Sequence, residues 1–209
     1  MSDWTIEDFY RYMQQQLLDR GPGYRCIIGD SITAAAPLEL VAGQPPINAG
    51  IGGARVGDAL RLILPTLMGS QPAALLLAIG VNDTKRQFPE PQTQRLTDFH
   101  RDYRDLVRGA RRLTPHVGLL LIGPVAKGMD VGDTFFDPEL ILAFNAIIAA
   151  VATEFKAPLF PLAGLEGADR LAHPHVTHDG VHLSDAGYVI WNEVVARAWA
   201  KLLVPVTRA

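Results

Sequence analysis

The stretch Tyr24-Arg25-Cys26-Ile27-Ile28-Gly29-Asp30-Ser31 joins a short apolar run to a glycine, an acid and a serine. The apolar run predicts a buried strand over residues 24–28, so the polar residues lie at the carboxyl end of that strand. A glycine-flanked hydroxyl in this place can be presented at the edge of a sheet. The same pattern is typical of a serine that caps the next helix, and from this segment alone capping is the commoner interpretation.

The other serines of the chain are less suited to act as a nucleophile. The sequence contains four serines in all. Ser2 lies at the terminus, Ser70 lies in a Gly-Ser-Gln-Pro turn, and Ser184 stands at a predicted helix start. Ser31 is therefore the candidate nucleophile.

Apolar runs and helical patterns alternate along the rest of the chain. The apolar runs predict strands at residues 24–28, 46–49, 73–79, 117–122 and 158–160. Apolar spacing, caps and stop signals predict helices at residues 4–18, 32–41, 55–68, 93–113, 137–155 and 184–203. Pro37 and Pro65 are expected to kink or end two of these helices. The alternation predicts an α/β fold with a mostly parallel five-stranded sheet covered on both faces. We expect a single domain over 1–209, with 1–22 as an N-terminal helical extension.

The composition excludes several classes of protein. The chain has 209 residues, of which 48% are hydrophobic and 20% are charged, as in ordinary globular domains. The net charge of −3 does not favour a nucleic-acid partner. The single cysteine, Cys26, excludes an intrachain disulfide. The first residues lack the pattern of a signal peptide and no apolar run is long enough for a membrane span, so we expect no membrane partner. A cytoplasmic location is expected, provided that no leader has been removed.

Polar and glycine clusters follow the predicted strands or lie in a late loop. They are Gly29-Asp30-Ser31, Asn48-Ala49-Gly50-Ile51-Gly52-Gly53, Gly80-Val81-Asn82-Asp83 and His178-Asp179-Gly180-Val181-His182. Because ligands of open α/β sheets bind at the carboxyl ends of the strands, these clusters can converge on one site.

The residue types in these clusters fit acyl transfer. A serine needs a base to take its proton, and histidine can serve near neutral pH. Asp179 and His182 are three residues apart, so a carboxylate can fix the imidazole tautomer. The backbone N–H groups of Ser31 and Gly53 and the side-chain amide of Asn82 can supply an oxyanion hole.

Each cluster also has a simpler interpretation. Asn82 is typical of a turn, and the glycines after Asn48 can serve only a tight turn. They do not form the dinucleotide-binding pattern. Four histidines crowd one stretch, namely His173, His175, His178 and His182. The sequence shows no second cluster that would complete a metal site, so we expect no metal and no organic cofactor.

Taken together and in this order, the four clusters resemble the sequence blocks of the SGNH hydrolases, also called the GDSL family. The matched patterns are Gly-Asp-Ser, Asn-x-Gly-x-x-Gly, Gly-x-Asn-Asp and Asp-x-x-His, between Ile28 and His182. The resemblance implies a three-layer, flavodoxin-like fold. It implies Ser31 as nucleophile, His182 as base and Asp179 as its orienting partner, with Ser31, Gly53 and Asn82 as the oxyanion hole. Ile32 stands where the name motif has leucine.

The resemblance implies a serine esterase that forms an acyl-enzyme on a small-molecule ester, with an acylated carbohydrate as one possible substrate. A carbohydrate O-acetylesterase, a thioesterase and a lysophospholipase-type hydrolase are alternatives. A non-catalytic carbohydrate-binding relative and a flavin-binding module are rivals from other classes. The chain shows no lid domain, so we expect a shallow site for short acyl groups such as acetyl. The N-terminal helix is expected to cover a sheet edge or to join subunits of a homo-oligomer. The predicted substrate-lining residues are Val81, Thr84, Val125, Met129, Phe135, Phe136 and Val181, from block ends and the long loop 123–136.

Overall fold

The centre of the molecule is a parallel sheet of five strands in the order β2-β1-β3-β4-β7. The computed structural model describes residues 5–38, 45–87, 89–126, 130–131 and 134–203. The strands are β1 (Arg25–Gly29), β2 (Ile47–Gly50), β3 (Ala74–Ala78), β4 (Val117–Leu120) and β7 (Leu159–Phe160). Each strand lies close to its predicted range, and the order is that of flavodoxin-like folds, so the predicted fold class is confirmed.

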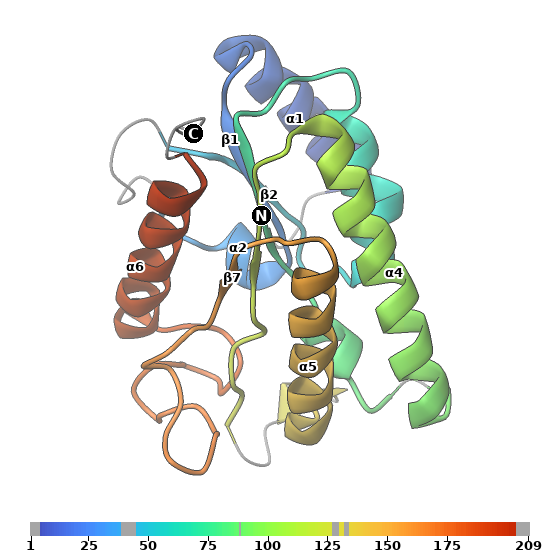
Figure 1. Ribbon diagram of the computed structural model, residues 1–209. Coiled ribbons are helices and arrows are strands. Elements are labelled where there is room, and N and C mark those ends of the chain that lie inside the picture. Colours follow the sequence, from blue (N-terminus) through green and yellow to red (C-terminus); the bar gives the residue numbers. More distant parts are fainter. Residues whose placement is uncertain (1–4, 39–44, 88, 127–129, 132–133, 204–209) are drawn as a thin grey trace, which may run out of the picture.

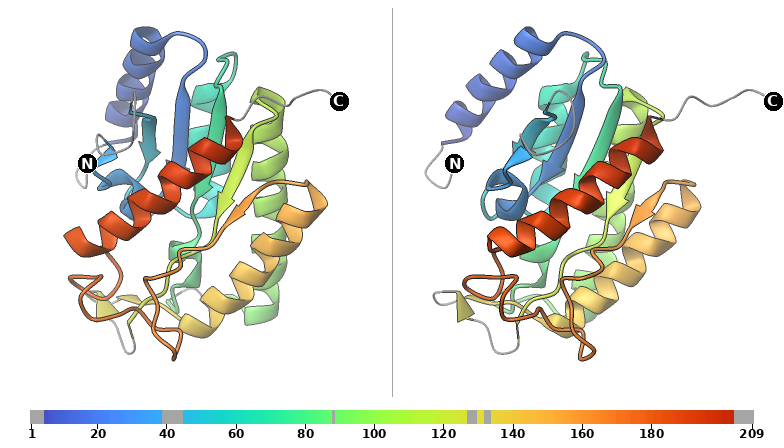
Figure 2. Two further views of the ribbon diagram at one scale, coloured as in Figure 1. Left: turned by 60° about the vertical axis from the view of Figure 1, so that its left-hand side comes forward. Right: turned by 90° about the vertical axis from the view of Figure 1, so that its left-hand side faces the viewer.

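Helices cover both faces of this sheet (Figure 1). One face packs against α1 (Ile6–Arg20), α4 (Gln92–Leu113) and α5 (Pro138–Glu154). The other face packs against α6 (Asp185–Leu202), which crosses the strands diagonally (Figure 2). Within the described residues, no helix combines the length and the apolar character needed to cross a membrane.

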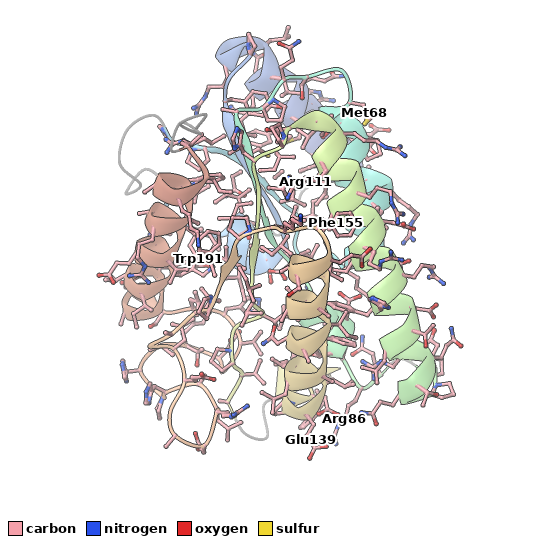
Figure 3. All side chains as sticks on the ribbon, in the orientation of Figure 1. Met68, Arg86, Arg111, Glu139, Phe155 and Trp191 are labelled. Carbon is pink, nitrogen blue, oxygen red and sulfur yellow. The ribbon has the colours of Figure 1, made fainter. Side chains whose placement is uncertain are left out.

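Neighbouring residues of a strand enter different cores, because side chains alternate across a sheet. In β1, Cys26 and Ile28 belong to the cluster on the α4 and α5 side, whereas Ile27 belongs to the cluster under α6. Trp191 of α6 is 1% exposed and packs in that second cluster (Figure 3). Both faces of the sheet are thus buried, which explains why the central strands are almost wholly apolar.

The helix predicted over residues 32–41 is wrong beyond its first turn. The observed helix, α2, spans only Ser31–Ala34. Ala36 precedes Pro37, and the residue before a proline is disfavoured in the helical conformation. Residues 39–44 of the predicted helix lie outside the described part of the chain.

The helix predicted over 55–68 is divided into three short pieces. These are α3 (Val56–Asp58), a π-helical turn η2 (Ala59–Ile63) and a 3₁₀ turn η3 (Leu64–Leu67). Pro65 cannot donate a backbone hydrogen bond, so a regular α-helix cannot continue through it.

The remaining elements are short. The turn η4 (Val81–Thr84) follows β3, and the long loop contains an antiparallel pair, β5 (Asp130–Val131) and β6 (Thr134–Phe135).

Candidate active site

The carboxyl end of β1 places Ser31 at the first position of α2. Asp179 and His182 lie on the irregular segment between β7 and α6, which runs below the strand ends in the view of Figure 1. The structure therefore brings together residues of the first and last predicted clusters at one end of the sheet.

Three side chains form a continuous hydrogen-bonded chain there. The Ser31 hydroxyl lies 3.0 Å from Nε2 of His182. Nδ1 of His182 lies 2.6 Å from Oδ2 of Asp179. Because a carboxylate can only accept, Nδ1 carries the proton, and Nε2 is left to accept from the serine. This is the tautomer that a base for Ser31 requires.

The carboxylate of Asp179 is held by the backbone that follows it. Its Oδ1 accepts from the N–H groups of Val181 at 3.0 Å and His182 at 2.8 Å. Partial burial alone would raise the pKa of Asp179, but the hydrogen bonds from the His182 side chain and from the two backbone groups outweigh it, so this pKa lies below its ordinary value. Asp179 is thus kept as the anion opposite the imidazole.

Asp30 and Tyr188 fix the short helix that carries Ser31. Asp30 caps α2 by accepting from the N–H of Ile32 at 3.0 Å. Burial raises the pKa of Asp30 to about 6. On the other side, the Tyr188 hydroxyl of α6 donates to the carbonyl of Ile32 over 2.8 Å. Both bonds are made to Ile32, so they hold in place the residue that follows the serine.

The second cluster packs against this helix. The side-chain amide of Asn48 donates to the carbonyl of Thr33 over 2.8 Å, and its oxygen accepts from the N–H of Gly50 at 3.0 Å. A Cβ on Gly50 would lie 2.3 Å from the backbone nitrogen of Ala34, so only glycine fits there. Gly53 has a φ of +75°, a conformation that also favours glycine.

The third cluster meets the second. Asn82 is 3% exposed, and its amide nitrogen donates to the carbonyl of Ala54 over 3.0 Å. The next residue, Asp83, accepts from the N–H of Val56 at 3.1 Å. Burial raises the pKa of Asp83 to about 7. These two bonds place Asn82 beside the backbone that follows Gly53. Gly53 and Asn82 are two of the residues that the sequence predicts as oxyanion donors.

A cavity of about 300 Å³ opens beside the serine. Its described lining is Ser31, Ala34, Ala35, Gly52, His178, His182, Leu183 and Tyr188. Sequence analysis did not identify Tyr188 as a site residue. The available signal was its place in the first turn of the helix that follows His182.

The described lining of this cavity contains none of the predicted substrate-lining residues, so their contact with a substrate stays a prediction. Val81, Thr84, Val125, Phe136 and Val181 are buried at 5% exposure or less. The guanidinium carbon of Arg86 lies over the ring of Phe135, 4.2 Å from the ring centre. Met129 lies outside the described residues. The pattern of strand ends located the site, but it could not show which neighbours face the serine.

The site thus joins a serine, a histidine and an aspartate in one hydrogen-bonded chain at the carboxyl end of a doubly wound, flavodoxin-like sheet. A model of the GDSL-like Lipase/Acylhydrolase family matches residues 27–190. The chain belongs to this family of ester hydrolases. A comparison with curated proteins gave no match.

Solved structures share the fold at low sequence identity. A GDSL-like lipase from Bacteroides thetaiotaomicron has a TM-score of 0.79 at 20% identity, covering 95% of this chain and 100% of that one. A lipase/acylhydrolase from Enterococcus faecalis has a TM-score of 0.69 at 17% identity, covering 89% and 100%. An acetyl xylan esterase has a TM-score of 0.67 at 20% identity, covering 87% and 100%.

Proposed function

We propose that the protein hydrolyses short-chain carboxylic esters, acetyl esters first among them, through an acyl-enzyme on Ser31. The observation that carries this proposal is the hydrogen-bonded chain from Ser31 through His182 to Asp179, with distances of 3.0 Å and 2.6 Å. It has the connectivity that a serine nucleophile, a general base and an orienting carboxylate need.

In the first half-reaction, Oγ of Ser31 attacks the ester carbonyl carbon while its proton passes to Nε2 of His182. The imidazolium formed is stabilised by the anionic Asp179. Collapse of the tetrahedral intermediate breaks the bond to the alcohol oxygen, which leaves with the proton from His182. Water then attacks the acyl-serine by the same route, and the acid product and free Ser31 result.

The oxyanion of the intermediate is assigned three donors. The backbone N–H of Ser31 belongs to the first turn of α2, where N–H groups have no partner within the helix. Gly53 offers a backbone N–H from the neighbouring loop. Asn82 uses one amide hydrogen on Ala54, which leaves its second amide hydrogen for the substrate. Each donor is worth about 10²- to 10³-fold in rate.

The lining of the cavity supports a small acyl group and an exposed alcohol group. Ala34 and Ala35 offer little area for a long acyl chain, and Tyr188 and His178 add flat rings. An acetyl xylan esterase is among the proteins that share the fold. Acetylated sugars are therefore the first natural substrates to test.

The test is a panel of p-nitrophenyl esters from acetyl to decanoyl, together with acetylated xylo-oligosaccharides. We expect kcat/KM to be highest for acetyl and Ser31→Ala to lower it by at least about 10³-fold. Ser70→Ala is the matched control, because the Ser70 hydroxyl hydrogen-bonds to Leu67 and Tyr24 instead of to the site. A preference for acyl chains of eight or more carbons would refute the short-chain assignment. Retention of most turnover by Ser31→Ala would refute the serine mechanism.

A further inference from the structure

His178 lies next to the Ser31-His182-Asp179 chain and lines the cavity, but it transfers no proton in the proposed reaction. Its Nε2 is 3.9 Å from Oδ2 of Asp179, and its ring lies 6.0 Å from that of His182 at an angle of 21°. Potential ligand atoms of His178, Asp179 and His182 all lie within 4.8 Å of one another. We propose that these three residues form an inhibitory binding site for a borderline-soft divalent ion, Zn²⁺ in particular.

The ring of His178 is already oriented as a ligand. Its Nδ1 lies 3.3 Å from the carbonyl oxygen of Leu183. A carbonyl only accepts, so Nδ1 carries the proton and Nε2 keeps its lone pair on the side of Asp179. Metal-binding histidines characteristically donate their other ring N–H to a carbonyl or carboxylate. The side chain of His178 is 63% exposed, so an ion can reach it from solvent.

The geometry needs only a small adjustment. Two ligands of a tetrahedral zinc ion at about 2.0–2.1 Å are roughly 3.3 Å apart. The contact between His182 and Asp179, now 2.6 Å, has to widen, and that between His178 and Asp179, now 3.9 Å, has to shorten. All three side chains are partly exposed, which gives them room to move. Two imidazoles and a carboxylate leave the fourth position of zinc to water.

Zinc at this site excludes the proposed catalysis, and this consequence rests on the proposed function. To bind the ion, Nδ1 of His182 must offer a lone pair, so the ring proton moves to Nε2. Nε2 can then no longer accept the proton of Ser31. The same histidine cannot serve both purposes at once.

Isothermal titration calorimetry of the chelator-treated protein with ZnCl₂ tests the site by measuring binding, independently of enzymatic activity. We expect one zinc ion per chain, and binding at least about tenfold weaker for His178→Gln, since even an outer partner of a zinc ligand is worth about 10- to 100-fold. His175→Gln, which changes a histidine of the same segment outside the three-residue cluster, and Ser31→Ala are expected to bind as the wild type does. MgCl₂ is expected to give no binding, because Mg²⁺ prefers oxygen ligands.

A parallel assay measures zinc inhibition of p-nitrophenyl acetate hydrolysis, with each variant normalised to its own metal-free rate. We expect the half-inhibiting zinc concentration to rise at least tenfold in His178→Gln. Absence of zinc binding to the wild type, equal binding by His178→Gln, or a loss of binding in His175→Gln would overturn the proposal. If the wild type hydrolyses no ester, the proposed function fails, and the titration still decides the metal site.

Discussion

The side-chain amide of Asn82 donates to the backbone carbonyl of Ala54 over 3.0 Å, and so joins the segments that follow β3 and β2. In the proposed mechanism, the second amide hydrogen stabilises the oxyanion. Asn82→Ala is expected to lower kcat by about 10²- to 10³-fold with little change in KM, because the lost bond forms mainly in the transition state. Steady-state kinetics with p-nitrophenyl acetate check this. An unchanged kcat in a variant whose circular dichroism matches the wild type would exclude Asn82 from the oxyanion hole.

Asp179→Asn is expected to change the tautomer of His182 while keeping the backbone hydrogen bonds that position residue 179. An asparagine oxygen can still accept from the N–H groups of Val181 and His182, as Oδ1 of Asp179 does now. Its NH₂ group would then face Nδ1 of His182, which favours the proton on Nε2. We expect a loss of about 10⁴-fold in kcat with stability nearly kept. If the variant retained more than a tenth of the activity, Asp179 would not be the orienting group.

Glycine is required at Gly50 for a steric reason that does not apply at Gly52. A Cβ on Gly50 would meet backbone atoms of Ala34 at 2.3 Å and 2.8 Å, whereas a Cβ on Gly52 would meet nothing within 4 Å. Gly50→Ala is expected to reduce the free energy of unfolding by about 3 kcal/mol, the upper end for overpacking. Gly52→Ala is the matched control and is expected to change it little. Urea denaturation compares the two, and equal losses would contradict the packing argument.

Asp83 is expected to make stability depend on pH. Burial raises its pKa in the folded protein to about 7 from an ordinary value of 3.8. The folded state therefore holds the proton more tightly, so the stabilisation is complete below about pH 4 and is lost as pH rises through about 7. The free energy of unfolding should fall across this range in the wild type.

In Asp83→Asn, the free energy of unfolding is expected to fall less steeply over the same pH range. The asparagine oxygen can accept from the N–H of Val56, but the side chain does not ionise. Asp30 keeps a residual slope, since burial also raises its pKa, to about 6. Denaturant titrations between pH 4.5 and 8 measure both slopes. Identical slopes in the two proteins would show that Asp83 is ionised throughout.

Arg111 connects the carboxyl ends of α4 and α5 (Figure 3). Its guanidinium donates to the carbonyls of Pro115 and Phe155, each over 2.7 Å. Arg111→Met is expected to cost about 1–3 kcal/mol in the free energy of unfolding, because it removes charge-assisted bonds and leaves the part-buried carbonyl of Phe155 without this donor. Arg108→Met removes only an exposed ion pair with Asp105 and is expected to have little effect. Similar losses in both variants would contradict this role.

The fold could be predicted because the hydrophobic pattern and the residues that start and end helices indicate the same elements. Residues 73–79 form an unbroken apolar run and become the central strand β3, and Ser184 caps α6 by accepting from the N–H of Gly187. The predicted helix lengths were wrong at the two helices that contain or precede a proline. Pro37 follows a helix that has already ended at Ala34, and Pro65 lies where π and 3₁₀ turns replace an α-helix.

Local sequence patterns predicted which polar residues of the candidate site come together, but not which residues line the cavity. Ser31, Asp179 and His182 belong to short local patterns that the parallel topology carries to one edge. The lining of the cavity depends on long-range packing, which no local pattern records. Tyr188 reaches Ile32 across 156 positions of sequence, and Val181 turns into the core although it adjoins His182.

The most direct test of the central claim is chemical labelling of the nucleophile. The protein is incubated with a fluorophosphonate, which phosphonylates activated serines, and the site of the adduct is located by peptide mass spectrometry. We expect one adduct per chain on Ser31, absent in Ser31→Ala and strongly slowed in His182→Ala, with Ser70 and Ser184 unlabelled. Ester hydrolysis by a wild-type protein that carries no adduct on Ser31, or that carries it on another residue, would contradict the account.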